Sequence, residues 1–156
     1  MDKFQENELK GRSWFSEMLT QFGATDLQPT TEIYDKVDIY FSNKGKKIVA
    51  EIKCRDIKYL DYPEHIIEEI KIKGLFQAKN EKNCDEAYYV NFFGENVAII
   101  YTLKAIQKHS RKDTLWCNWK TAELSNKTEK VVYYIPVECG RKYEKKDGIW
   151  SSDKYL

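Results

Sequence analysis

Two short apolar segments separated by a polar turn are the clearest feature of the hydrophobic pattern, within residues 37–53 (VDIYFSNKGKKIVAEIK). Apolar and β-branched residues on both sides of a turn at residues 42–46 predict a β-hairpin. Because side chains alternate along a strand, Glu51 and Lys53 are expected on one face, with Ile52 on the other. If Asp38 faces them from the first strand, two carboxylates and an ammonium converge at the strand end.

The segments around this hairpin have a helical or a strand pattern. Apolar residues every three or four positions predict an amphipathic helix over residues 2–22, ending at Gly23. A short strand is expected within residues 31–34. Pro63 and the apolar positions that follow predict a second helix over residues 63–79.

Two further strands, at residues 86–93 and 97–103, flank a Gly-Glu-Asn turn, and Thr102 is expected to cap a short helix that runs to His109. The order strand, strand, helix, strand creates a crossover unit, which is right-handed in nearly all sheets. The predicted fold class is therefore α/β, with a mixed β-sheet flanked by helices.

The last fifty residues predict a β-rich extension, roughly residues 104–156, on a core of about residues 2–103. KVVYYIPVE is a clear strand pattern, while LWCNWK and RKYEKKDGIW mix aromatic residues with lysines. Those aromatic residues, which are Trp116, Trp119, Tyr143 and Trp150, either stack on bases or pack into the core. Packing is favoured, because aromatic side chains on strands are more often buried.

Length and charge narrow the function classes. A chain of 156 residues predicts one compact domain. A net charge of +1 argues against a strongly basic nucleic-acid coat, so any such binding must use local basic patches. The four cysteines have no paired spacing, which argues against a zinc ribbon and suits reduced thiols. The polar N-terminus and the lack of a membrane-length apolar run predict a cytoplasmic protein with no membrane partner.

The acid and lysine at residues 51 and 53 differ from similar pairs by their context. An acid, any residue and a lysine occur five times in the chain, so the tripeptide alone carries little information. Only Glu51 and Lys53 end an apolar run and follow an acid, Asp38, embedded in another. Charges placed there are costly to bury unless they are paired or metal-bound, which favours an active site. The alternative is a surface hairpin whose charges are solvated.

At these residues the chain resembles the PD-(D/E)XK nuclease superfamily, whose members have the restriction-endonuclease-like fold. The resemblance rests on Asp38, Glu51 and Lys53 and on the predicted elements around them, and it covers about residues 2–103. One departure is Val37, which stands where the family name has proline. The resemblance implies that Asp38, Glu51 and Lys53 are catalytic, and that Asp38, Glu51 and the Ile52 carbonyl hold Mg²⁺, for which Mn²⁺ would substitute.

Nucleases of this superfamily often contribute one more acid from the first helix. Glu8 lies in the apolar stripe of the predicted helix and is the preferred additional metal ligand. Glu17 is the rival, although the helical spacing places it on the solvent side. A third interpretation is that Glu8 is a solvated glutamate, favoured near a helix start by the helix dipole.

Several cations are candidate nucleic-acid contacts. Arg55 lies two residues beyond Lys53, where it would meet a phosphate or pair with Asp56 or Asp61. Some relatives place a functional lysine or glutamine on the helix after the hairpin, but here Lys71 and Gln77 are expected to be mainly solvated. The basic segment KHSRKD is the best phosphate-contacting loop of the second half, and it adds Lys108, Arg111 and Lys112.

The expected function is Mg²⁺-dependent endonucleolytic hydrolysis of DNA, in recombination, repair, restriction or bacteriophage DNA processing. A metal-bound water is a stronger nucleophile, and Lys53 would orient it and offset the charge growing on the phosphate. RNA is an alternative substrate for the same chemistry, and a homodimer is one way to cut both strands. The competing class is a non-catalytic nucleic-acid- or protein-binding module, such as an anti-defence or accessory protein, on the same fold.

Overall fold

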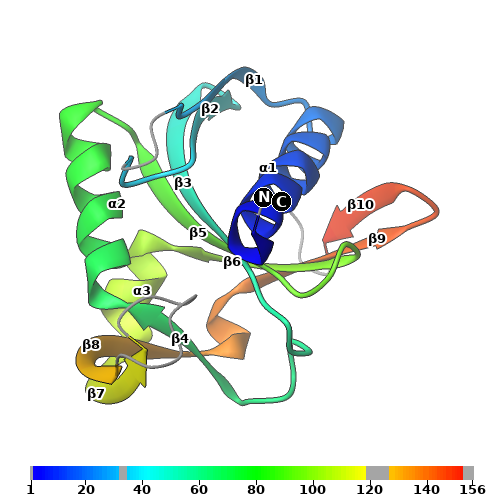
Figure 1. The fold of residues 1–156 in the computed structure, drawn as a ribbon. Coiled ribbons are helices and arrows are strands. Elements are labelled where there is room, and N and C mark those ends of the chain that lie inside the picture. Colours follow the sequence, from blue (N-terminus) through cyan, green and yellow to red (C-terminus); the bar gives the residue numbers. More distant parts are fainter. Residues whose placement is uncertain (1, 32–34, 119–126, 153–156) are drawn as a thin grey trace.

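The computed structural model (Figure 1) describes residues 2–31, 35–118 and 127–152. Its elements in chain order are α1 (Lys3–Gln21), β1 (Thr25–Pro29), β2 (Ile39–Asn43), β3 (Lys46–Cys54), β4 (Glu64–Glu68), α2 (Glu69–Glu81), β5 (Glu86–Phe92), β6 (Val97–Thr102), α3 (Leu103–His109), β7 (Arg111–Asn118), β8 (Lys127–Pro136), the 3₁₀ turn η1 (Val137–Cys139), β9 (Arg141–Lys146) and β10 (Ile149–Ser152). No helix within these ranges is both long and apolar enough to cross a membrane.

A mixed sheet with the strand order β1-β2-β3-β5-β6-β9-β10 forms the centre of the fold. The pairing of β3 with β5 is parallel, and the other pairings in this sheet are antiparallel. Helix α1 covers one face of the sheet, while α2 and α3 cover the other (Figure 1). The α/β fold class and the β3-α2-β5 crossover predicted from the sequence are therefore confirmed.

The side chains of β3 divide between the two faces. Ile48, Ala50 and Ile52 pack with α1, whereas Val49 packs with α2 and α3. The preceding turn places Lys44 and Gly45 at positive φ, 50° and 77°, as a two-residue hairpin turn requires. This geometry confirms the predicted hairpin.

Helix α1 forms one continuous element over most of its predicted range. Phe15, Met18 and Leu19 are buried, and Gly23 follows the helix at φ 77°, as predicted. Gly11 does not break the helix. A methyl group at Gly11 would lie 2.9 Å from Cγ2 of Ile52, so the glycine allows α1 to approach β3 closely.

The helix predicted over residues 63–79 starts later than expected. Residues 64–68 form β4, which pairs antiparallel with β8, and α2 begins only at Glu69. The β-branched Ile66 and Ile67 find a partner strand some 65 residues away, and Ile67 is completely buried in this position. A tertiary pairing therefore overrides the local helical spacing, and the predicted helix start at Pro63 is wrong.

The C-terminal third contributes to both sheets. Strands β7 and β8 join β4 in a separate three-stranded sheet, whereas β9 and β10 extend the central sheet beyond β6. The predicted strand KVVYYIPVE forms most of β8, and the helix capped by Thr102 is α3. Tyr143 and Trp150 are buried in the core, as the packing interpretation predicts. Residues 32–34 and Trp119, and also the side chain of Trp116, lie outside the described part of the chain.

Candidate active site

The end of β3 borders a cavity of about 180 Å³, whose wall also includes residues from the start of α1 and from β4. Glu51, Ile52 and Lys53 line this cavity from the strand, and Glu8 lines it from the first turns of α1. Arg55 and Glu68 complete its polar wall. The folding of the chain therefore brings the acid, the lysine and the helix acid singled out in the sequence to one place.

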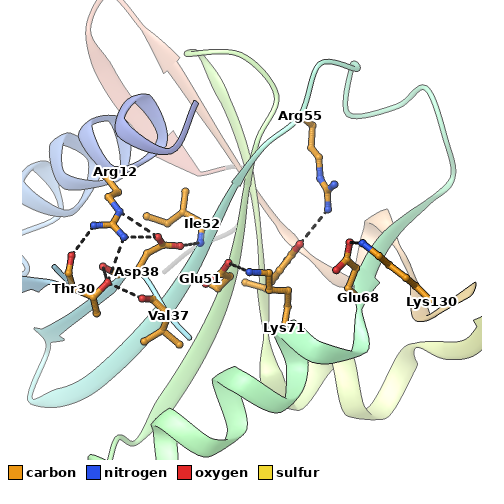
Figure 2. Close-up of polar contacts among 11 residues, drawn as sticks. Arg12, Thr30, Val37, Asp38, Glu51, Ile52, Arg55, Glu68, Lys71 and Lys130 are labelled. Atoms are coloured by element: carbon orange, nitrogen blue, oxygen red, sulfur yellow. Dashed lines mark hydrogen bonds and ion pairs between the residues drawn. The ribbon is translucent and has the colours of Figure 1, made fainter. Parts of the chain in front are cut away.

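Asp38 lies just before β2, opposite Glu51 in the hairpin, and is 7% exposed. Its Oδ2 accepts a hydrogen bond of 2.7 Å from the backbone N–H of Ile52. Its Oδ1 accepts from Nη2 and Nε of Arg12, at 3.0 and 3.2 Å (Figure 2). The aspartate is therefore fixed between the backbone of β3 and a guanidinium from α1.

Arg12 is a site residue that the sequence analysis did not identify. Its Nη1 also donates to the backbone oxygen of Thr30 at 2.7 Å, so one side chain joins α1, the end of β1 and Asp38. The sequence signal for Arg12 is its position four residues after Glu8. Residues four apart lie on the same side of a helix, so Arg12 is expected on the side of α1 that carries Glu8. The guanidinium neutralises Asp38 and holds the carboxylate in place.

Glu51 is buried, with 6% exposure, and its Oε1 lies 3.2 Å from Nζ of Lys71 (Figure 2). Burial, together with the negative charge of Asp38, raises the pKa of Glu51 to about 7 from its ordinary value of 4.5. The charges of Lys71 and Lys53 act in the opposite direction without cancelling this effect. The negative charge of Asp38 is therefore close enough to Glu51 to disfavour its ionisation.

Lys71 does not lie in solvent as expected. It is in the first turn of α2 and reaches Glu51, with its side chain 31% exposed. Burial alone would lower the pKa of Lys71, but the carboxylate of Glu51 outweighs this effect and raises it. The expectation that Lys71 is mainly solvated is wrong because α2 starts six residues later than predicted. Gln77, by contrast, is exposed and contacts Lys36.

Lys53 is half-buried on the wall of the cavity. Its Nζ lies 6.0 Å from the centre of the Phe4 ring. Burial and the nearby charge of Lys71 lower the pKa of Lys53, while Glu51 partly offsets them. The lysine is thus a partly desolvated cation that lines the same cavity as Glu51.

The two helix acids lie at different places. Glu8 is exposed and faces the cavity that Glu51 and Lys53 line. Glu17 lies farther along α1 and is 3.7 Å from Lys145 of β9. The geometry thus favours Glu8 over Glu17 as an additional ligand, and its role remains a prediction.

The predicted phosphate contacts have different surroundings. Arg55 borders the cavity and donates hydrogen bonds to Asn91, Ile66 and Tyr89 rather than pairing with Asp56 or Asp61. The segment KHSRKD is not a loop, because Lys108 and His109 belong to the last turn of α3 and Arg111 begins β7. Arg111 pairs with Glu64 at 2.9 Å and Lys112 with Glu69 at 3.3 Å. These ion pairs reduce the positive charge that the segment offers to a phosphate.

The donor set fits a hard divalent cation with few protein ligands. Across residues 2–31, 35–118 and 127–152, no group of three or more His, Cys, Asp and Glu side chains surrounds a single point. Mg²⁺, however, keeps several waters and is usually held by one or two carboxylates. Asp38 and Glu51 are two such carboxylates, and their mutual repulsion would be relieved by a cation. The Ile52 carbonyl stays a predicted third donor.

A comparison with solved structures identifies a similar chain architecture. The Holliday junction resolvase Hjc from Archaeoglobus fulgidus superposes with a TM-score of 0.52, over 83% of this chain and 92% of that chain. This chain has the restriction-endonuclease-like fold. The sequence identity is 13%, so the likeness is one of fold. No protein-family model and no curated protein sequence matches the chain.

Proposed function

We propose that the protein is a divalent-metal-dependent nuclease of the PD-(D/E)XK superfamily that hydrolyses phosphodiester bonds in DNA. The observation that carries the proposal is the buried Glu51, which lines one cavity with the half-buried Lys53 and is close enough to the buried Asp38 to feel its charge. Burying such charges is expensive, and a fold maintains them when they bind a ligand or act chemically. The fold shared with a Holliday junction resolvase supports the same function.

Each side chain has a distinct role in this proposal. Asp38 and Glu51 would hold Mg²⁺ or Mn²⁺, with the Ile52 carbonyl and Glu8 as further donors directly or through water. The bound cation supplies a water of lowered pKa and offsets negative charge on the phosphate. Lys53 would donate to the attacking water and the phosphate oxygens, because its side chain lines the same cavity as Glu51.

Two cations hold the acids in the absence of metal. Arg12 contacts Oδ1 of Asp38, and the Ile52 N–H donates to one lone pair of Oδ2. The second lone pair of Oδ2 would then be available to a metal. Lys71 contacts Oε1 of Glu51 and would be displaced toward a phosphate oxygen when the cation binds. Lys71 would therefore act as a substrate contact in the loaded site.

The test is cleavage of linear duplex, nicked, branched and single-stranded DNA in the presence of Mg²⁺ or Mn²⁺. Wild-type protein is expected to cut at least one of these substrates, and EDTA is expected to stop it. Glu51→Ala and Lys53→Ala should lose cleavage while keeping the folded circular dichroism spectrum. Lys146→Ala is the matched control, because Glu144 and Lys146 repeat the same tripeptide spacing at an exposed site on β9.

A wild-type protein that leaves all four DNA substrates intact with both metals would contradict the proposal. Equal activity in Lys53→Ala and Lys146→Ala would also contradict it. The remaining alternative is then a binding module on the same fold, and RNA is tested in the same assay as a further substrate.

A further inference from the structure

A second cavity, of about 400 Å³, lies next to the candidate active site. Its wall is mainly apolar and aromatic and includes Arg55, Ile57, Tyr62, His65, Phe93 and Tyr134. We call it the aromatic cavity. It lies between the segment that follows β3 and the start of β4. A concave site of this size with few polar groups is typical of a pocket for a flat organic ligand.

The aromatic cavity adjoins the candidate active site. Arg55 and Ile66 line both of them. A ligand whose charged part lies at Glu51 and Lys53 would therefore reach the aromatic cavity across the Arg55 side chain.

Arg55 is held rigidly at this border. Its Nε donates to Oδ1 of Asn91 at 3.2 Å, and its Nη2 donates to the oxygen of Ile66 at 3.0 Å and to Tyr89 Oη at 3.1 Å. Within the part of the chain that the structure describes, Nη1 makes no hydrogen bond. A guanidinium fixed in this way presents its remaining donors to a phosphate with little loss of side-chain entropy.

The floor of the aromatic cavity is also fixed. The ring of Phe93 lies 4.8 Å from that of His65. Nε2 of His65 lies 3.0 Å from the Tyr59 oxygen, and Nδ1 lies 2.6 Å from the Tyr101 hydroxyl. These bonds tie the segment after β3 to β4 and β6, so the cavity exists before a ligand binds.

The rim carries apolar side chains that face solvent. Tyr62 is 59% exposed and Ile57 is 40% exposed. Clustered exposed apolar side chains at the mouth of a cavity mark a ligand site more often than isolated ones do. Glu64, which also lines the aromatic cavity, is paired with Arg111 at 2.9 Å. This ion pair reduces the repulsion between the Glu64 carboxylate and a nucleic-acid strand. The guanidinium of Arg111 in turn lies 4.4 Å from the ring centre of Tyr134.

We propose that the aromatic cavity binds one unpaired nucleobase of the strand whose backbone passes the candidate active site. This inference rests on the proposed nuclease function and specifies its substrate class. A paired base inside a duplex is stacked and cannot enter a concave pocket, whereas a base in a single-stranded arm enters without the cost of unpairing. The protein is therefore selective for DNA that carries unpaired bases near the cut.

The test compares the binding of two forked DNAs. One is a duplex that ends in two single-stranded arms of thymidines, and the other is the same duplex with abasic arms of equal length. Both are measured in Ca²⁺ by fluorescence anisotropy, and the DNA is checked afterwards for cleavage. The abasic arms keep the phosphates and remove the bases. Wild-type protein is expected to bind them about tenfold more weakly, since stacking of one base on aromatic side chains is typically of that size. Tyr62→Ala should reduce this penalty to about threefold or less.

Leu60→Ala is the matched control for Tyr62→Ala. Leu60 lies in the same segment and is 67% exposed, but it does not line the aromatic cavity. This variant should keep the full penalty for abasic arms. Equal binding of both DNAs by wild-type protein, or an unchanged penalty in Tyr62→Ala, would overturn the base-binding proposal and leave the nuclease proposal intact. Failure to bind either DNA would overturn both.

Discussion

Glu51 should make the metal-free fold less stable as the pH rises. Its pKa is about 7 in the folded protein, against an ordinary value of 4.5. Between these values the folded protein holds a proton that the unfolded chain has released, so the free energy of unfolding falls as the pH increases. The loss is absent below pH 4.5 and complete above pH 7. At 1.36 kcal/mol for each pH unit, the gap amounts to about 3 kcal/mol.

The perturbation that isolates this effect is Glu51→Gln, which keeps an oxygen for Lys71 and removes the titration. Urea unfolding followed by circular dichroism, in EDTA at pH 4.5 and pH 8, gives the free energy of unfolding of both proteins. All other titrating groups are shared, so the difference between the two proteins reports on Glu51. This difference should change by about 3 kcal/mol in favour of Glu51→Gln as the pH rises.

Glu17→Gln is the matched control, because Glu17 is an exposed acid on α1 that pairs with Lys145 at 3.7 Å. Its stability should follow that of wild-type protein at both pH values. Parallel profiles for wild-type protein and Glu51→Gln would refute the reasoning, because they would mean that Glu51 is not a desolvated acid beside Asp38.

Three further predictions concern neighbouring side chains. Arg12→Ala leaves the buried Asp38 carboxylate without its cation and should lower the free energy of unfolding by about 3 kcal/mol in a urea titration; a loss below about 1 kcal/mol would contradict this. Gly11→Ala places a methyl 2.9 Å from Ile52 and should destabilise by about 1 kcal/mol despite its better helix propensity, whereas Ser13→Ala, at an exposed position, should not. The rate of metal-dependent cleavage should rise with pH through about 7, because the cation needs ionised Glu51. Lys71→Met should move this rise to higher pH, since Lys71 lowers the pKa of Glu51. An identical pH profile in Lys71→Met would contradict this role.

Local sequence patterns were sufficient to predict the β2-β3 hairpin and helix α1. The turn at Lys44 and Gly45 has residues suited to its backbone, and the apolar run of β3 matches its burial on both faces. The helix wheel placed Glu8 in the apolar stripe of α1, and the residue lines the cavity although it is exposed. In each case the deciding interactions lie within a few residues along the chain.

Contacts between residues far apart in the sequence could not be predicted from such local patterns. Strand β4 forms because β8 lies beside it, and the local spacing of its isoleucines also suits a helix. The displaced start of α2 then changed the direction of Lys71, which contacts Glu51 instead of solvent. Arg12 and Asp38 are 26 residues apart, and no local pattern links them. Side chains that meet across elements depend on the fold as a whole.

Calorimetric titration with Mn²⁺ tests most directly whether Asp38 and Glu51 form a metal site that serves phosphodiester hydrolysis. Wild-type protein should bind Mn²⁺ at pH 8, Lys53→Ala should still bind it, and Glu51→Gln should lose most of the affinity. Absence of Mn²⁺ binding to wild-type protein, or equal binding to Glu51→Gln, would contradict the account.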